Sequence, residues 1–127
     1  MFPAWHIAVT SLVTAAITAA GTAGWRRPTS QRTTGRSPLT LGDVVGVSVA
    51  AGLGVLLWRL GANVPTLNDD PIPGVSPADV LSAPMAYVAA SIYVRLRAAG
   101  APGRFERLAV APALAALVAL VVNIVTI

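Results

Sequence analysis

The sequence predicts an all-α membrane protein with four transmembrane helices arranged as two antiparallel hairpins. Two observations lead to this fold class. First, the 127 residues are 55% hydrophobic and only 11% charged, whereas an ordinary soluble domain has about 25% charged residues and needs them to cover its surface. Second, the apolar residues fall into four segments, separated by loops rich in proline, arginine or aspartate. We therefore expect a single membrane domain over residues 1–127.

The first two apolar segments, residues 4–24 and 41–60, have the length of transmembrane helices. The first of them contains no Asp, Glu, Lys or Arg. At about 1.5 Å per residue, such a helix spans roughly 30 Å, which is the thickness of the hydrocarbon core of a bilayer. Thr40, followed three residues later by Asp43, predicts a capping box at the start of the second helix. Asp43 is accordingly interpreted as a helix-start carboxylate rather than as a proton carrier.

The last two helices are predicted over residues 77–98 and 105–127. Ser76, Pro77 and Asp79 supply an N-cap, a proline at the first helical position and an acid at the third, which together form a strong helix-start signal. The uncharged part of the third helix has only 15 residues, which is short for a span. The alternative is therefore a three-span protein in which this helix lies in the membrane interface.

Two prolines are predicted to lie inside these helices. Pro84 and Pro112 each lack a backbone N–H, and each leaves a carbonyl one turn earlier without its usual donor. We expect both prolines to kink their helices, as prolines often do in membrane spans.

The arginines determine the predicted orientation. Eight of them lie in or beside two loops, residues 25–40 and 99–104, and the positive-inside rule places both loops in the cytoplasm. The loop 62–76 is proline-rich and acidic, and we expect it outside, together with both termini. The arginines are expected to contact anionic lipid headgroups; they are Arg26, Arg27, Arg32, Arg36, Arg95, Arg97, Arg104 and Arg107. The expected location is the cell membrane, either a bacterial inner membrane or an equivalent one.

Polar residues recur every four positions along the first helix. This polar stripe consists of His6, Thr10, Thr14, Thr18 and Thr22. In one interpretation it lines a pore or groove. In the other, each hydroxyl bonds the carbonyl one turn back, and the residue packs as a small side chain. Because four such steps drift by about 160° around a straight helix, the packing interpretation is favoured.

Two further rows of residues predict close helix packing. Small side chains let two helix backbones approach each other, and the rows are Gly42, Gly46, Ala50 and Gly54, then Ala111, Ala115, Ala119 and Asn123. For the glycine row, self-association and packing against the first helix are equally favoured. If this row is a packing face, Gly46→Leu should do more damage than Val47→Leu. Asn123 is expected to face a partner helix, with a ligand contact as the alternative, because an unpaired amide in hydrocarbon costs several kcal/mol.

The sequence predicts neither an enzyme nor a cofactor. It has no cysteine and one histidine, and no paired carboxylates, metal-ligand cluster, serine triad or glycine-rich phosphate loop can be recognised. We expect a non-catalytic accessory or assembly subunit of a larger membrane complex. Its expected partners are the lipid bilayer and other membrane protein chains or itself; nucleic acid is not expected, because no aromatic residues interleave the arginines of the first loop. The alternatives are a holin-like protein that oligomerises to permeabilise the membrane and, third, a small channel or carrier.

Overall fold

A computed structural model describes residues 2–25, 39–99 and 104–126, and it is all-helical. The structure is 82% helical, and no strand occurs among the described residues. Within these described ranges six helices follow one another: α1 (Ala4–Trp25), α2 (Leu41–Gly61), α3 (Pro65–Asn68), α4 (Pro77–Ala98), α5 (Arg104–Leu108) and α6 (Ala111–Val125). The predicted all-α fold class is therefore confirmed.

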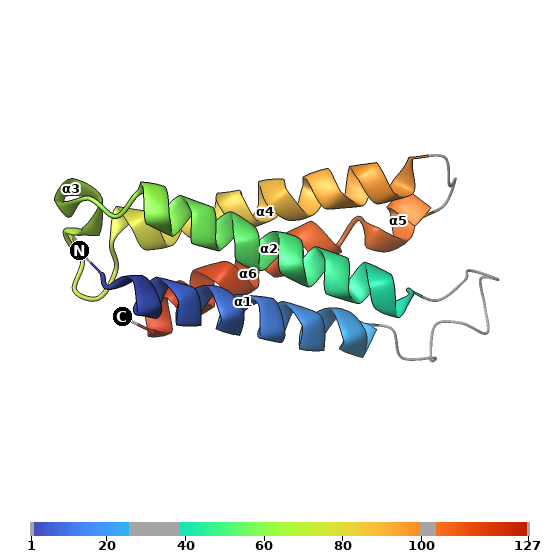
Figure 1. Ribbon diagram of the computed structural model, residues 1–127, viewed down its shortest axis with the longest axis horizontal. Helices are drawn as coiled ribbons and strands as arrows, with labels where there is room; N and C mark the ends of the chain where they lie inside the picture. The colour runs from blue at the N-terminus through green and yellow to red at the C-terminus, as the bar shows by residue number, and fades with distance from the viewer. Residues whose placement is uncertain (1, 26–38, 100–103, 127) are drawn as a thin grey trace.

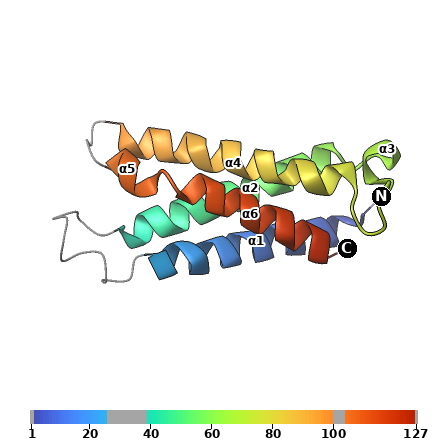
Figure 2. The same cartoon turned by 180° about the vertical axis from the view of Figure 1, so that it is seen from behind.

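The long helices form an antiparallel bundle (Figure 1). Helix α2 packs against both α1 and α4, and α6 packs against both α4 and α1, an order that is also visible from behind (Figure 2). We call one end of the bundle the α3 end; it holds both chain ends, the end of α2 and the start of α4 (Figure 1). We call the other the α5 end; it holds the end of α1, the start of α2 and the end of α4.

The starts of α2 and α4 are fixed by local side-chain bonds, as the sequence predicts. In α2, Asp43 N–H donates to Thr40 Oγ1 over 3.1 Å, and Thr40 N–H donates to Asp43 Oδ2 over 3.0 Å. In α4, Ser76 and Asp79 form the same reciprocal pair, and Pro77 occupies the first turn. The predicted capping box of α2 and the predicted helix-start signal of α4 are confirmed, and the signal of α4 is also a capping box. Each uses only side chains within four consecutive residues.

The predicted last helix is not continuous. The sequence analysis expects one helix over residues 105–127 with Pro112 inside it, but α5 ends at Leu108 and α6 begins at Ala111. Pro112 lies in the first turn of α6, where its missing N–H removes no intrahelical bond. It therefore begins a helix instead of kinking one. Pro84, in contrast, lies inside α4 as predicted.

The segment between α2 and α4 contains a tight turn. Val75 N–H donates to Ile72 O over 2.9 Å, and between them lie Pro73 and Gly74. Gly74 has a φ of 76°, and this combination of proline followed by a left-handed glycine is typical of a type II turn. The turn leads directly into the N-cap of α4.

The apolar core is formed by α2, α4, α5 and α6, whereas α1 contributes mainly hydroxyl groups. The core includes Val47, Val55, Ala86, Ala90, Val94, Leu108 and Ala115. On α1, Ile7 is the large apolar side chain that is buried, and the other buried residues are Thr10, Ser11, Thr14, Thr18 and Thr22. Small and hydroxyl side chains therefore form the face by which α1 packs against α2 and α6.

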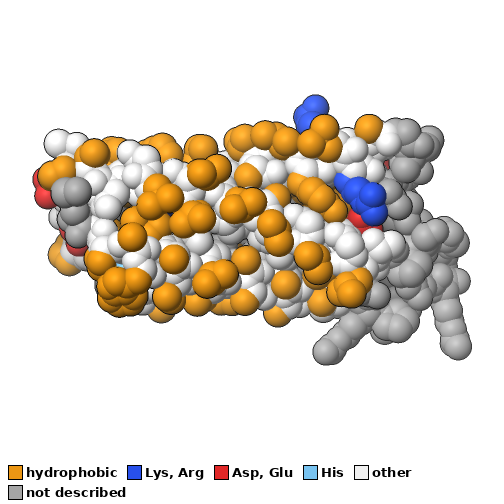
Figure 3. Space-filling view, viewed as in Figure 1, with side chains coloured by type: hydrophobic (Ala, Val, Ile, Leu, Met, Phe, Trp, Pro, Cys, Tyr) orange, Lys and Arg blue, Asp and Glu red, His pale blue; other side chains and the backbone are white. Residues whose placement is uncertain are grey.

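The outer surface is apolar along the length of the bundle. Large hydrophobic side chains are exposed on every long helix, among them Leu12, Leu53, Leu57, Ile92, Leu96, Leu117 and Val121. Outside the grey region of Figure 3, hydrophobic side chains are spread along the visible face, and few charged side chains appear among them. By length and composition, residues 4–24 and 41–61 are each able to cross a membrane. The bundle therefore has a strongly apolar exterior, and its interior contains buried polar side chains beside the apolar core.

Candidate functional site

The most strongly polar part of the interior is an ion pair at the α3 end. Arg59, in the last turn of α2, donates through Nη1 to Oδ1 of Asp79. The two side chains are 2% and 0% exposed. The other oxygen of Asp79 accepts hydrogen bonds from the backbone N–H and the hydroxyl of Ser76. One carboxylate therefore caps α4 and also neutralises the arginine of α2.

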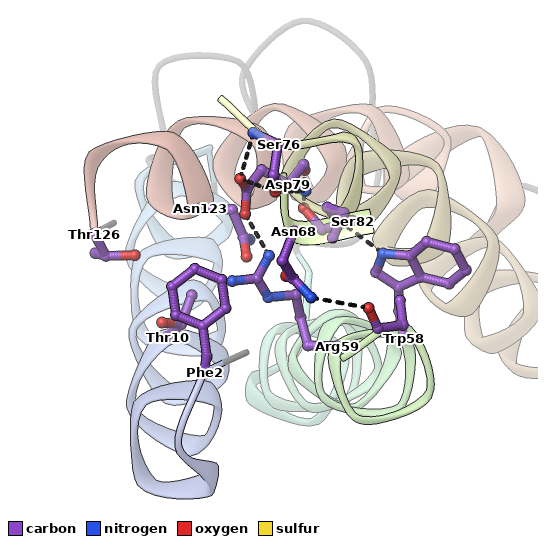
Figure 4. Close-up of polar contacts among 12 residues, drawn as sticks. Phe2, Thr10, Trp58, Arg59, Asn68, Ser76, Asp79, Ser82, Asn123 and Thr126 are labelled. Carbon is purple, nitrogen blue, oxygen red and sulfur yellow. Dashed lines mark hydrogen bonds and ion pairs between the residues drawn. The ribbon is translucent and has the colours of Figure 1, made fainter. Parts of the chain in front are cut away.

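The N-terminal residues cover this ion pair. The Cζ of Arg59 lies 4.7 Å from the centroid of the Phe2 ring, a distance typical of a cation–π contact. The backbone of Phe2 is held by one amide, because its N–H donates to Asn63 Oδ1 over 2.9 Å and its carbonyl accepts from Asn63 Nδ2 over 3.0 Å. We call Phe2 and Pro3 the N-terminal strap. Figure 4 shows the Phe2 ring beside the Arg59 guanidinium.

Further buried polar side chains, from α1, α4 and α6, lie near the pair (Figure 4). Thr10 of α1, Ser82 of α4 and Asn123 of α6 are each at most 2% exposed. In Figure 4 the side chain of Asn123 points toward Arg59. Its Nδ2 donates to Ala119 O over 2.7 Å, whereas its Oδ1 has no partner within the described residues. All four long helices therefore contribute to one polar cluster, which we call the α3-end cluster.

A second ion pair joins α2 and α4 at the α5 end. Arg97 Nε lies 3.4 Å from Asp43 Oδ1, and the two side chains are 47% and 4% exposed. Nearby, the Tyr93 hydroxyl donates to Gly42 O over 3.0 Å. Asp43, like Asp79, belongs to a capping box. The antiparallel pair α2–α4 therefore has a similar ion pair at each end.

The predicted polar stripe faces the interior of the bundle. Thr10, Thr14, Thr18 and Thr22 are each at most 2% exposed, and His6 is partly exposed. Three hydroxyls donate to the carbonyl four residues back, over 2.7 to 2.9 Å; these are the bonds that the packing interpretation predicts. The hydroxyl of Thr18 has no partner among the described residues.

Within the chain, Gly46 and Gly54 of the glycine row pack against α4 and not against α1; self-association stays a prediction. A methyl group on Gly46 would overlap the ring of Tyr93. One on Gly54 would lie 2.8 Å from Ala89 Cβ and 2.9 Å from the carbonyl oxygen of Met85. Gly42 is exposed and Ala50 is half-buried. The small residues let α4 approach α2 closely, as glycines do in packed membrane helices.

Another glycine of α2, which the sequence analysis did not single out, faces the first helix. A methyl group on Gly52 would lie 3.0 Å from both Ala15 Cβ and the carbonyl oxygen of Ser11. The two faces of α2 are thus served by different glycines. Val47, the comparison residue for Gly46 in the sequence analysis, is fully buried. Val47→Leu is therefore a core substitution and not a neutral control.

The remaining predicted residues are located as follows. On α6, Ala111, Ala115, Ala119 and Asn123 are all buried, and Ala115 and Ala119 contribute to the apolar core. Arg95 and Arg97 are exposed at the α5 end. Arg104 and Arg107 belong to α5, but their side chains lie outside the described part of the structure; Arg26, Arg27, Arg32 and Arg36 lie outside the described residues altogether.

Sequence reasoning missed the pairing of Arg59 with Asp79. It identified Asp79 only as a helix-start acid and assigned no role to Arg59. The sequence does contain a signal for this pairing. When one loop joins two antiparallel helices, the last turn of the helix before the loop lies beside the first turn of the helix after it. Phe2 and Asn63 are 61 residues apart, and no local pattern connects them.

An apolar groove lies between α1 and α2 on the outer surface. It has a volume of about 320 Å³ and is lined by Ala8, Ser11, Leu12, Ala15, Val49, Gly52, Leu53 and Leu56. The small residues in this lining, such as Ala15 and Gly52, lie where α1 and α2 approach each other closely. The groove is separate from the α3-end cluster, with which it shares no residue.

The α3-end cluster has the chemistry of a structural cross-link. One carboxylate oxygen is engaged by Arg59 and the other by Ser76. Within the described ranges, no group of three or more Asp, Glu or His residues is arranged to hold a metal ion. Comparisons with known proteins found no family model that matches the chain and no significantly similar curated protein or solved structure. The functional argument therefore depends on the geometry alone.

Proposed function

We propose that this chain is a four-helix integral membrane protein that acts by helix packing, as an accessory or assembly subunit of a larger membrane complex. The observation that carries the proposal is the apolar exterior of the bundle, together with the polar side chains that are buried inside it. Polar side chains such as Thr14, Asp79 and Asn123 are fully buried, whereas Leu12, Leu57 and Leu96 are about 70% exposed. In water such an exterior would be an aggregation hazard, but in lipid it is the expected surface.

The dimensions of the bundle support four spans. Helices α1, α2 and α4 have 22, 21 and 22 residues, which corresponds to about 32 Å each. Helices α5 and α6 together return over the same length (Figure 1). The ion pairs at the two ends keep charge away from the middle of the bundle. The positive-inside rule then favours a cytoplasmic α5 end and an outer α3 end, with both termini outside.

The role as a packing subunit is supported by how the polar groups are used. The hydroxyls of Thr10, Thr14 and Thr22 bond their own helix, and the buried charges of Arg59 and Asp79 bond each other. The exterior therefore presents mainly apolar helix faces. Such faces recognise lipid tails or other transmembrane helices through close packing.

Two experiments test this proposal. A reporter fused after Ile127 should be active only outside the cytoplasm; activity in the cytoplasm would contradict the four-span topology. Purification of the tagged chain in a mild detergent should recover other membrane protein chains in fixed stoichiometry. Recovery of the chain alone, at wild-type expression levels and in the membrane fraction, would contradict the accessory role.

One observation favours a second candidate, a holin-like pore or a small channel. The row from Thr10 to Thr22 runs along α1 and faces the interior, so it would supply hydroxyls to a water path if α1 moved away from its neighbours. Inducible expression distinguishes the candidates. Dye entry and growth arrest on induction would support the pore, whereas an intact membrane at the same expression level would support the packing subunit.

A further inference from the structure

The cover over the Arg59–Asp79 pair is made of few contacts. Phe2 and Pro3 precede the first helix. Pro3 is tied to the start of α1, because its carbonyl accepts from the backbone N–H groups of His6 and Ile7. Phe2 is held by two hydrogen bonds to the single side chain of Asn63 and by contacts of its ring with the Arg59 guanidinium and the His6 ring. Phe2 itself is only partly buried. Few contacts and exposed backbone bonds are the features of segments that open locally while the rest of the fold stays intact.

The strength of the Arg59–Asp79 ion pair beneath the strap depends strongly on whether water reaches it. An ion pair is much stronger in a dry environment than in water, because water screens both charges. Arg59 and Asp79 are dry in this structure. Beside them the carbonyl oxygen of Asn123 is buried without a partner, so the first water molecules to enter would find an unused acceptor. Opening the strap would therefore weaken the bond between α2 and α4 at this end.

We propose that the N-terminal strap is a lid that controls the access of water to the Arg59–Asp79 pair, with the amide of Asn63 as its latch. Closed, the lid keeps the pair dry and holds the end of α2 against the start of α4. Open, it exposes a guanidinium to the aqueous phase. This inference concerns one end of the bundle and does not depend on the accessory role proposed above.

The test measures how fast a guanidinium-directed dicarbonyl, phenylglyoxal, modifies each arginine of the full chain in detergent, with peptide mass spectrometry as the readout. In the wild-type protein Arg59 should react far more slowly than the exposed Arg95. Asn63→Ala removes both hydrogen bonds of the strap, and Phe2→Ala removes the ring. Asn63→Ala should raise the rate at Arg59 by about tenfold or more, because losing about two hydrogen bonds shifts a local opening equilibrium by that factor. Phe2→Ala should also raise this rate, because it removes the ring that lies over the guanidinium. The rate at Arg95 should not change.

Asn68→Ala is the matched control. Asn68 is also an amide of the α2–α4 connection, but its Nδ2 donates to Ala62 O and Val64 O and it does not hold the strap. This change should leave Arg59 protected. Fast modification of Arg59 in the wild type, or continued protection in both Phe2→Ala and Asn63→Ala, would overturn the lid. Equal acceleration at Arg59 and Arg95 would also overturn it, because that result shows global unfolding. If Asn63→Ala does not fold, Phe2→Ala, which leaves both backbone hydrogen bonds to Asn63 in place and removes the ring over the guanidinium, decides the question.

Discussion

At each end of the α2–α4 pair, a capping-box aspartate on one helix accepts a hydrogen bond from an arginine of the other. At the α3 end the pair is Asp79 with Arg59, and at the α5 end it is Asp43 with Arg97. The aspartates are almost equally buried, but the arginine is 2% exposed at one end and 47% exposed at the other. The same pairing of a capping-box aspartate with an arginine should therefore contribute differently to stability at the two ends. The free energy lost when the aspartate is removed depends on how deeply the arginine is buried.

The largest expected effect follows from removing one charge at each end by the same substitution. Asp79→Asn keeps the size of the side chain but leaves Arg59 buried without a counter-charge, so it should lower the free energy of unfolding by about 3–5 kcal/mol. Asp43→Asn leaves a half-exposed arginine that water can solvate, so it should cost about 1 kcal/mol or less. Unfolding in mixed micelles, followed by circular dichroism, measures both; equal losses would show that burial does not separate the two ends.

A double variant determines whether the stranded charge is the cause. Arg59→Met removes the charge and keeps an apolar stem, so Asp79→Asn combined with Arg59→Met should recover most of the stability lost by Asp79→Asn alone. No recovery would mean that the lost hydrogen bonds, and not the unpaired arginine, account for the single variant.

The next largest difference between the two ends is expected in the cost, in free energy of unfolding, of replacing a glycine of α2 by alanine. At Gly54 an added methyl group would meet Ala89 Cβ and the backbone of Met85, which cannot move without shifting α4. Gly54→Ala should therefore cost about 1–3 kcal/mol. At Gly46 the obstacle is the ring of Tyr93, a partly exposed side chain that can rotate away. Moving the ring would break its hydrogen bond to Gly42 O, so Gly46→Ala should cost about 1 kcal/mol, less than Gly54→Ala. The same unfolding assay would contradict this explanation if Gly46→Ala were the more damaging change.

A smaller effect is expected at Asn123, and it shows whether the ion pair acts alone at the α3 end. Asn123→Leu removes one hydrogen bond to Ala119 O and also removes a buried oxygen without a partner. These two changes oppose each other, so the free energy of unfolding should change by about 1 kcal/mol or less. A loss of more than about 2 kcal/mol would mean that Asn123 helps to hold the guanidinium of Arg59.

What could be predicted from the sequence was local in the chain. The capping boxes at Thr40 and Ser76 and the row of buried threonines follow from spacings of three or four residues. The break before α6 was missed although its signal is local, because Pro112 fits both the interior and the first turn of a helix. The choice between them depends on where the preceding turn ends.

The contacts that build the candidate site join distant parts of the chain. Arg59 and Asp79 are 20 residues apart, and Phe2 and Asn63 are 61 apart. Pairing them requires knowing which face of each helix is buried, and the small residues of α2 give no unique answer. Gly46 and Gly54 face α4, whereas Gly52 faces α1, so the helix has packing glycines on two sides. A row of small residues predicts close packing but does not identify the partner.

The smallest expected effect concerns salt. Arg97→Gln keeps much of the length of the side chain and removes the charge next to Asp43, so at low ionic strength it should cost about 1 kcal/mol or less. This cost should shrink as salt rises, because the Debye length falls from about 30 Å at 0.01 M to about 3 Å at 1 M and screens exposed charges. The cost of Arg59→Gln should stay constant over the same range, since its charge is shielded from solvent. Unfolding of both variants at several salt concentrations measures the two trends, and a salt-dependent cost at Arg59 would mean that water already reaches the pair beneath Phe2.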